Sequence, residues 1–422
     1  MEKLRVHSGH KLFGNIKICS SKNALLPILA GSILAQNEVI LTDIPNFSDI
    51  SKMVEILRSL GAGVIKYDSS LSIGTKTIDK FFVSYELGKD IRGSIVFLGA
   101  LLSKFKKACI SYPGGCNIGA RPIDLHIKGL KALGVKIVEE HGYLYCDGRD
   151  MKPSTFCFEK QSVGATENLM LASVLLSGTT KLVNCAKEPE VVDLANFLNK
   201  MGAKINGAGT NTITIYGVEK LDGITYKVIG DRIVAGTYLV ATAICGGNVE
   251  ICNIEPKFLT SVTKKLCYCG CNIDIKNDKI RLSAEARCKA LKSITTGVYP
   301  KFPTDMQSAF LSLMTVSKGN SIIYERLFDG RFKQVPDLIK MGAKIQTNCN
   351  YAKVCGVERL SGADVSATDL RAGAGLVLAG LVADGYTTID NVHYIDRGYD
   401  HIEKDLSLLG AEIERIEWET KD

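Results

Sequence analysis

The stretch LNKMGAKING, residues 198–207, carries the pattern that decides the fold: an apolar residue, Gly202, a small residue and then alternating apolar positions. A glycine between a helical segment and a strand is typical of a left-handed helix C-cap, which disfavours residues with a Cβ. The pattern occurs six times, as LRSLGAGVIK (57–66), LKALGVKIVE (130–139), LNKMGAKING (198–207), LCYCGCNIDI (266–275), LIKMGAKIQT (338–347) and LSLLGAEIER (406–415). The sequence therefore predicts six copies of one α/β unit.

The shared glycines are spaced almost evenly. They are Gly61, Gly134, Gly202, Gly270, Gly342 and Gly410, at intervals of 73, 68, 68, 72 and 68 residues. A repeat of this length exceeds a solenoid unit and predicts a βαβ-type module. Each unit also has an earlier segment that is apolar on nearly all faces, over 24–34, 94–102, 166–176, 236–244, 306–314 and 372–382. We expect these helices inside a core and the helices before the glycines nearer solvent.

The length of 422 residues exceeds what one hydrophobic core usually supports, so the six units divide into three plus three, with a break near Gly230. The last unit has room for only one strand after its glycine, at 411–419. We expect the leading segment, 4–18, to supply the strand that completes it. The predicted domains are 22–229, and 1–21 with 230–422, so the chain crosses between them twice.

Composition narrows the class of protein. Apolar residues make up 46% and charged residues 23%, as in ordinary globular proteins. The first residues lack the apolar core of a secretion signal, and no apolar stretch is long enough to span a bilayer. Fourteen cysteines in such a chain favour reduced thiols and a cytoplasmic location. The net charge of +7 is dispersed, which leaves open a nucleic acid or a small anionic substrate as the ligand.

Two kinds of site are not expected. Cys267, Cys269 and Cys271 lack the paired spacing of a zinc site and have no histidine nearby, so no metal is predicted. No glycine-rich phosphate-binding motif follows a predicted strand and opens a helix.

Polar residues stand directly before the predicted buried helices. They are Lys22 with Asn23, Arg92, Ser162 with Val163 and Gly164, Asp231 with Arg232, Asp305, and Asp369 with Arg371. Helix N-termini attract anions, so several of them together predict an anion site. Ser162 and Asp231 can equally be simple helix caps, and we expect Asp305 to cap its helix as well. Lys22, Arg92 and Arg371 oppose the helix dipole, which favours an external anion.

Two loops carry further unusual chemistry. The first is SYPGGCNIGARPIDLH, residues 111–126, which contains Gly114, Gly115, Cys116, Gly119 and Arg121. Its glycines let the backbone move and approach a ligand, so we interpret it as a functional lid, the alternative being a buried thiol at Cys116. The second is IDRGYD, residues 395–400, where Arg397 is either a ligand contact or a solvated side chain.

Six motifs together resemble a known family. They are CSSKNALLP (19–27), YPGGCNIGARPIDLH (112–126), SVGATEN (162–168), FPTDMQ (302–307), ATDLRAGAG (367–375) and IDRGYD (395–400). In order and spacing they resemble the UDP-N-acetylglucosamine 1-carboxyvinyltransferase family of enolpyruvyl transferases, across essentially the whole chain. The resemblance implies an α/β fold of two inside-out barrel domains, each built of three βαβαββ repeats, with the active site in the cleft between them.

The resemblance also implies the reaction. The enolpyruvyl group of phosphoenolpyruvate passes to the 3'-hydroxyl of UDP-N-acetylglucosamine by addition and elimination, releasing phosphate, as the first committed step of peptidoglycan precursor synthesis. No cofactor or metal is implied, and the sequence does not predict an oligomeric state. The nearest alternative activity is that of a 3-phosphoshikimate 1-carboxyvinyltransferase. A clamp that grips nucleic acid without chemistry is the alternative from another class of protein.

Site residues follow from the resemblance, motif by motif. The implied catalytic residues are Cys116, Asp305, Lys22 and Asp369, with Cys116 also the residue modified by substrate and by the epoxide fosfomycin. Phosphoenolpyruvate would contact Lys22, Asn23, Arg92, Arg121, Arg371 and Arg397. The sugar nucleotide would contact Arg92, Arg121, Pro122, Ile123, Asp124, Leu125, Lys160, Ser162, Val163, Gly164, Asp305 and Leu327. The chain departs from the family pattern at Ser48, Val234 and Leu327, where Lys, Glu and Ile are more usual.

Overall fold

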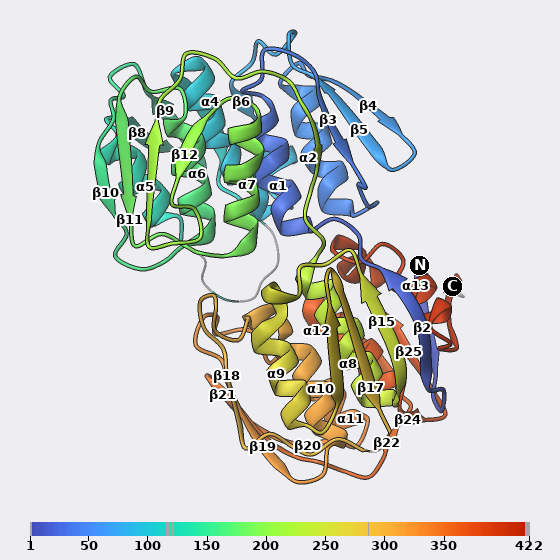
Figure 1. Ribbon diagram of the computed structural model, residues 1–422. Coiled ribbons are helices and arrows are strands. Elements are labelled where there is room, and N and C mark those ends of the chain that lie inside the picture. The colour runs from blue at the N-terminus through green and yellow to red at the C-terminus, as the bar shows by residue number, and fades with distance from the viewer. Residues whose placement is uncertain (1, 115–118, 120–121, 286, 418–422) are drawn as a thin grey trace. The chain divides into compact units, whose positions relative to one another are not determined.

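A computed structural model of the protein describes residues 2–114, 119, 122–285 and 287–417. These residues form two compact units (Figure 1): the first unit comprises 19–114 with 122–229, and the second unit comprises 2–18 with 119, 230–285 and 287–417. Each unit has a hydrophobic core of its own. Within the described residues, no helix is long and apolar enough to cross a membrane.

The described strands form six four-stranded sheets with one shared topology, three in each unit. Each sheet has a parallel pair of strands followed by two antiparallel strands. In the first unit the sheets are β14 (Thr225–Lys227), β3 (Val39–Thr42), β5 (Ser70–Gly74) and β4 (Gly63–Tyr67); β6 (Phe82–Val83), β7 (Lys107–Ser111), β9 (Tyr143–Asp147) and β8 (Lys136–Glu140); and β10 (Thr155–Cys157), β11 (Thr179–Val183), β13 (Thr212–Tyr216) and β12 (Lys204–Asn206).

The second unit repeats this arrangement. Its sheets are β2 (Leu12–Lys17), β15 (Gly247–Cys252), β17 (Lys279–Ala284) and β16 (Asn272–Lys276); β18 (Ser293–Thr295), β19 (Asn320–Tyr324), β21 (Tyr351–Cys355) and β20 (Lys344–Asn348); and β23 (Asp364–Ser366), β25 (Tyr386–Asp390), β1 (Glu2–His7) and β26 (Ile413–Glu417). A short parallel pair, β22 (Leu360–Ser361) with β24 (Ala383–Asp384), lies outside these sheets. Six equivalent sheets confirm the six predicted repeats.

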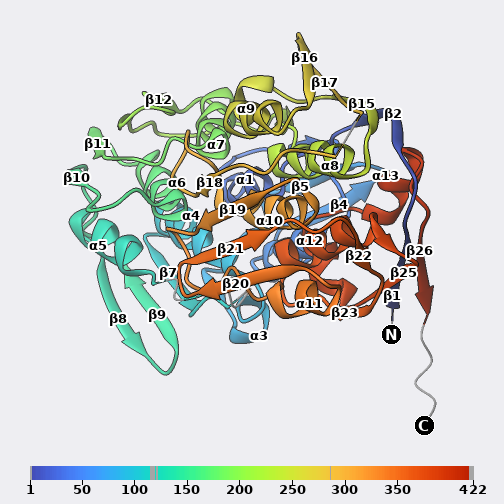
Figure 2. The same cartoon turned by 90° about the horizontal axis from the view of Figure 1, so that it is seen from below.

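The leading segment completes the second unit, as the sequence predicted. Strand β1 runs antiparallel to both β25 and β26, with Leu4 opposite Ile389 on one side and Arg415 on the other (Figure 2). Strand β2 then pairs in parallel with β15. In the first unit the late strand β14 pairs with β3 in the same way. Each unit is therefore closed by strands that are remote in sequence.

The first helix of each repeat lies in the interior. These helices are α1 (Lys22–Ser32), α4 (Phe97–Phe105) and α6 (Val163–Ser173) in the first unit, and α8 (Arg232–Cys245), α10 (Gln307–Val316) and α12 (Leu370–Gly380) in the second. Every residue of α10 and α12 is buried, and these two helices pack against each other. The second repeat differs from the prediction of one helix over 94–102, because a 3-10 helix, η1 (Arg92–Val96), precedes α4.

The second helix of each repeat keeps a solvent face. These helices are α2 (Ser48–Ser59), α5 (Asp124–Ala132), α7 (Pro189–Lys200), α9 (Thr260–Tyr268), α11 (Val335–Lys340) and α13 (Ile402–Leu408). The glycine that follows each of them has a positive φ, between 91° and 109°, which confirms the predicted left-handed C-caps. The remaining short helices are α3 (Tyr85–Gly88), η2 (Pro256–Leu259), η3 (Thr304–Met306) and η4 (Val392–Arg397).

The α/β class is confirmed, with helices in the interior of each unit and sheets that expose one face. In β13, for example, Ile213 and Ile215 are fully buried, while Tyr216, the residue after Ile215, points to the other face and is exposed. The sheets remain separate, and the described strands do not close into a barrel. The predicted inside-out arrangement, with helices inside and sheets outside, is therefore present in each unit. The described strands do not form the closed ring of hydrogen bonds that the term barrel implies.

Candidate active site

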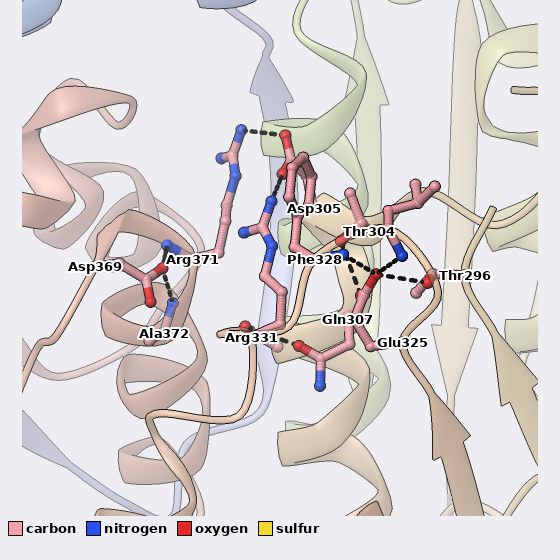
Figure 3. Close-up of polar contacts among 12 residues, drawn as sticks. Thr296, Thr304, Asp305, Gln307, Glu325, Phe328, Arg331, Asp369, Arg371 and Ala372 are labelled. Atoms are coloured by element: carbon pink, nitrogen blue, oxygen red, sulfur yellow. Dashed lines mark hydrogen bonds and ion pairs between the residues drawn. The ribbon is translucent and has the colours of Figure 1, made fainter. Parts of the chain in front are cut away.

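Two interior helices of the second unit begin with an aspartate cap. The Asp231 carboxylate accepts hydrogen bonds from the backbone N–H of Ile233 and Val234, at 2.8 and 3.1 Å. Asp369 does the same for Arg371 and Ala372, at 3.0 and 3.1 Å (Figure 3). These bonds satisfy N–H groups that have no partner within the helix. The capping interpretation that the sequence left open for Asp231 is therefore confirmed.

Asp305 does not cap its helix, and that part of the prediction is wrong. Helix α10 begins at Gln307, after η3, and no side-chain cap bond is made there. The Asp305 carboxylate instead lies between two arginines (Figure 3): Arg331 Nη2 donates to one oxygen at 2.5 Å and Arg371 Nη2 to the other at 3.3 Å. Two cations bind an ionised carboxylate more strongly than the N–H groups of a short helix.

The arginines set the protonation state of this carboxylate. Burial opposes ionisation of Asp305, but the charges of Arg371 and Arg331, the hydrogen bond from Arg331 and the charge of Arg232 together lower its pKa well below the usual range. The side chains of Arg331 and Arg371 are themselves only 5% exposed, and that of Asp305 is 24% exposed. At neutral pH the site therefore holds an ionised carboxylate between two buried arginine side chains.

Arg371 is held from a second side by Tyr399. Its Nη1 lies 3.5 Å from the Tyr399 hydroxyl, and the guanidinium lies over the Tyr399 ring, 5.9 Å from its centre. The Tyr399 hydroxyl is also 2.8 Å from Oγ1 of Thr237 in α8. Thr237 of α8, Asp305 of η3 and Arg371 of α12 thus belong to one polar cluster.

Arg331 is the site residue that sequence reasoning missed. It lies in the loop between β19 and α11, and its guanidinium also lies over the Phe328 ring at 5.3 Å. The repeat offered a signal for it, because Arg121 and Arg397 occupy the loops between the corresponding strand and helix of two other repeats. The same loop also contains Arg326, so this comparison points to the loop and does not distinguish Arg331 from Arg326.

In the first unit, Lys22 begins α1 and has an internal counter-ion. Its Nζ lies 2.7 Å from Oδ2 of Asp49, in the first turn of α2. Asn23 is the next residue of α1 and is partly exposed. The prediction explained Lys22 by an external anion only; the carboxylate of Asp49 also offsets its unfavourable position at a helix N-terminus.

A second group of predicted residues meets in the same unit. Arg92 begins η1 and donates from Nη2 to the carbonyl of Pro122 at 3.4 Å. His126 is buried, and its Nδ1 accepts from Asn168 at 2.9 Å. Burial and the charge of Arg92 lower the pKa of His126 to about 3, so the ring is neutral. A Cβ at Gly164 would approach this ring to 3.3 Å, so glycine permits the close packing.

The remaining residues that were predicted to contact substrate lie at the following positions. Ile123 and Leu125 are buried, Asp124 begins α5, and Lys160 is exposed. Ser162 caps α6, since its hydroxyl accepts from the Ala165 N–H at 3.4 Å, and Val163 follows it. In the second unit Leu327 is 38% exposed and Arg397 ends η4. Cys116 and Arg121 lie outside the described residues.

Comparisons with known proteins cover nearly the whole chain. The family model of EPSP synthase (3-phosphoshikimate 1-carboxyvinyltransferase) matches residues 6–406. The UDP-N-acetylglucosamine 1-carboxyvinyltransferase of Shewanella woodyi is 45% identical over 419 residues, which are 99% of this chain and 100% of that protein. The protein of the same name from Glaesserella parasuis is 47% identical over 419 residues, 99% of each chain.

Solved structures share the fold. The enolpyruvyl transferase NikO from Streptomyces tendae is similar with a TM-score of 0.88 at 24% identity, over 98% of each chain. An EPSP synthase from Acinetobacter baumannii is similar with a TM-score of 0.75 at 17% identity, over 99% of this chain and 100% of that one. At these identities the likeness concerns the two-domain α/β fold.

Proposed function

The chain belongs to the UDP-N-acetylglucosamine 1-carboxyvinyltransferase family, and on that premise we propose that it transfers the enolpyruvyl group of phosphoenolpyruvate to the 3'-hydroxyl of UDP-N-acetylglucosamine, with release of phosphate. This reaction is the first committed step of peptidoglycan precursor synthesis, and we place it in the cytoplasm, since the described cysteines are free thiols. The observation that carries the proposal is identity of 45–47% with such transferases along the entire chain.

The reaction moves protons at three points: the sugar hydroxyl loses one, C3 gains one, and C3 later loses one. The sugar oxygen bonds to C2 of phosphoenolpyruvate as C3 gains a proton; the tetrahedral adduct then loses a C3 proton and expels phosphate, which restores the double bond. In the proposal Asp305 accepts the hydroxyl proton, Cys116 delivers a proton to C3 and can add to the substrate, and Asp369 shares the proton traffic. The proposal divides the chain into the domains 22–229 and 1–21 with 230–422.

The cluster around Asp305 supports its role as a proton acceptor. An ionised carboxylate can only accept hydrogen bonds, so it orients a hydroxyl for attack. Its depressed pKa makes it a weak base while Arg371 and Arg331 face it. Arg371 is also proposed to contact phosphoenolpyruvate. When its charge is shared with that anion, the proton affinity of Asp305 rises and proton transfer becomes easier.

Five cations and one amide would hold the anionic substrate. We propose that Lys22, Asn23, Arg92, Arg121, Arg371 and Arg397 contact phosphoenolpyruvate. Their charges stabilise the carboxylate and phosphate through preorganised electrostatics, so the proposal needs no cofactor. We propose that the sugar nucleotide contacts Arg92, Arg121, Pro122, Ile123, Asp124, Leu125, Lys160, Ser162, Val163, Gly164, Asp305 and Leu327.

Phosphate release from phosphoenolpyruvate tests the proposal, with UDP-N-acetylglucosamine or shikimate 3-phosphate as the acceptor. We expect release only with the sugar nucleotide. Release only with shikimate 3-phosphate would instead support the activity named by the matching family model. Release with neither acceptor, together with salt-sensitive retention on DNA, would favour a nucleic-acid clamp.

A further inference from the structure

Glu325 follows β19 directly and is 3% exposed. Its carboxylate accepts four hydrogen bonds (Figure 3). Oε1 accepts from Thr296 Oγ1 at 2.8 Å and from the backbone N–H of Leu327 and Phe328 at 2.8 and 3.3 Å. Oε2 accepts from Thr304 Oγ1 at 2.8 Å. Four donors compensate the cost of burying this carboxylate.

These donors come from both sides of the Asp305 cluster. Thr304 is the residue immediately before Asp305. Leu327 and Phe328 belong to the loop that leads to Arg331 a few residues later. One carboxylate therefore ties together the two segments whose side chains form the Asp305–Arg331 ion pair.

A second bond strengthens the same connection. Thr296 Oγ1, which donates to Glu325, accepts from the backbone N–H of Arg326 at 2.9 Å. Hydrogen bonds to a charged acceptor are stronger than those between neutral groups, and donors in one network reinforce each other. The loop from Arg326 to Phe328 is thus fixed against the segment that carries Thr304.

We propose that Glu325 is a positioning residue for the reaction, which holds Asp305 and Arg331 at the separation that their ion pair requires. The inference rests on the proposed function of Asp305 as the group that accepts the hydroxyl proton. Glu325 would act through Asp305 and Arg331 without touching substrate. A misplacement of about 1 Å in a catalytic group lowers a rate by roughly 10²-fold, so a residue that sets this distance should control turnover.

Two substitutions separate the loss of the negative charge from the loss of the hydrogen bonds. Glu325→Gln keeps an oxygen for the three bonds at Oε1, and its amide can donate to Thr304 once that hydroxyl turns, so we expect kcat within about threefold of the parent. Glu325→Ala removes all four bonds, and we expect kcat to fall by roughly 10²-fold. Equal losses in both variants would overturn the proposal.

A double-mutant cycle with Arg331→Ala tests the route of action. If Glu325 acts through the ion pair, Glu325→Ala should lower kcat little further once Arg331 is gone. Ser312→Ala is the matched control, because it removes a buried hydrogen bond between α10 and α12, from Ser312 Oγ to the Gly375 carbonyl at 2.7 Å, in which no residue of the Asp305 cluster takes part. It should leave kcat unchanged and combine additively with Arg331→Ala. Additive losses from Glu325→Ala and Arg331→Ala would overturn the proposal.

A readout that does not depend on activity keeps this inference separate from the proposed function. The carboxyl of Asp305 can be titrated by NMR in the full chain with ¹³C-labelled aspartate. Its pKa should rise towards the ordinary value in Glu325→Ala and stay low in Glu325→Gln and Ser312→Ala. An unchanged titration in Glu325→Ala would overturn the positioning role even in an active enzyme. Should that variant not fold, Thr304→Val removes one bond, and a rise in the Asp305 pKa is expected there too.

Discussion

Lys22 Nζ lies 2.7 Å from Oδ2 of Asp49, and this ion pair joins the first turn of α1 to the first turn of α2. The side chains are only 10% and 4% exposed, so both charges have lost most of their hydration. In such a pair the attraction offsets the desolvation of two ions, and removing one partner leaves the other charge buried.

Asp49→Asn should therefore destabilise the protein by about 3–5 kcal/mol. Urea unfolding at neutral pH measures the change. Asp150→Asn breaks the ion pair between Asp150 and Lys136, whose side chains are 67% and 73% exposed, and should change the stability far less. Similar losses for the two variants would show that the Lys22–Asp49 pair is no more important than a surface contact.

Replacing Arg397 by Ala should weaken the use of phosphoenolpyruvate far more than the binding of UDP-N-acetylglucosamine. One charged hydrogen bond contributes about 1.5–3 kcal/mol, which corresponds to roughly ten- to a hundredfold. Lys22→Ala should show the same selectivity, provided that unfolding measurements confirm a folded protein, since Asp49 then loses its partner. Calorimetry that finds an equal loss of sugar-nucleotide affinity would reverse the assignment of substrates.

Asp305→Asn should abolish most turnover and make stability less dependent on acid pH. The folded-state pKa of Asp305 is lowered, so its ionised form adds stability above the unfolded pKa, near 3.9, and this contribution is lost as the pH falls towards the folded value. The difference in unfolding free energy between parent and variant should thus shrink between about pH 5 and pH 2. A difference that stays constant would show that the arginines do not stabilise the ionised form.

Asp193 offers a control with the opposite sign. Burial raises its pKa to about 6, although hydrogen bonds from Tyr226 and the Ile229 N–H act against this. Its protonated form is favoured in the folded state, so its contribution is complete below the unfolded pKa and is lost as the pH rises through about 6. The loss of unfolding free energy caused by Asp193→Asn should therefore decrease between about pH 4 and pH 7. The loss caused by Asp305→Asn should instead increase as the pH rises.

Cys116 should be the thiol that fosfomycin alkylates, and faster with the sugar nucleotide bound. Arg121 and the other proposed cations would attract the phosphonate and favour the thiolate. Burial raises the pKa of Cys146, Cys245 and Cys269 to about 12, so these thiols should stay inert. Mass spectrometry of the treated protein identifies the modified residue.

The exposed thiols are the natural competitors in that experiment: Cys157, Cys267, Cys349 and Cys355. Because these thiols are exposed but are not part of the proposed cationic site, we expect fosfomycin to alkylate them slowly, at a rate that the sugar nucleotide does not change. Cys116→Ala should lose the alkylation and roughly 10²–10⁴ in rate, whereas Cys116→Asp keeps a proton donor and should resist the epoxide. Modification of Cys267 in preference to Cys116 would show that the 111–126 loop is not at the active site.

The amino-acid sequence by itself determined the repeat architecture of this protein. Gly202 and its equivalents mark a backbone conformation that a local pattern encodes, and the apolar segments before them can be stable only in an interior. The count of strands even predicted that β1 completes the last sheet. Motifs also singled out Asp305 and Arg371, whose side chains form an ion pair in the structure.

Only the tertiary structure decided which charges meet. Asp305 pairs with Arg331 and Arg371, which lie 26 and 66 residues further along the chain, and Glu325 joins the segments that carry the nearer pair. A cap was the local expectation for Asp305, but its carboxylate instead pairs with Arg331 of its own repeat and with Arg371 of the next repeat. Such partners depend on how a loop folds back within one repeat and on how neighbouring repeats pack, and no spacing within one segment of sequence encodes those distances.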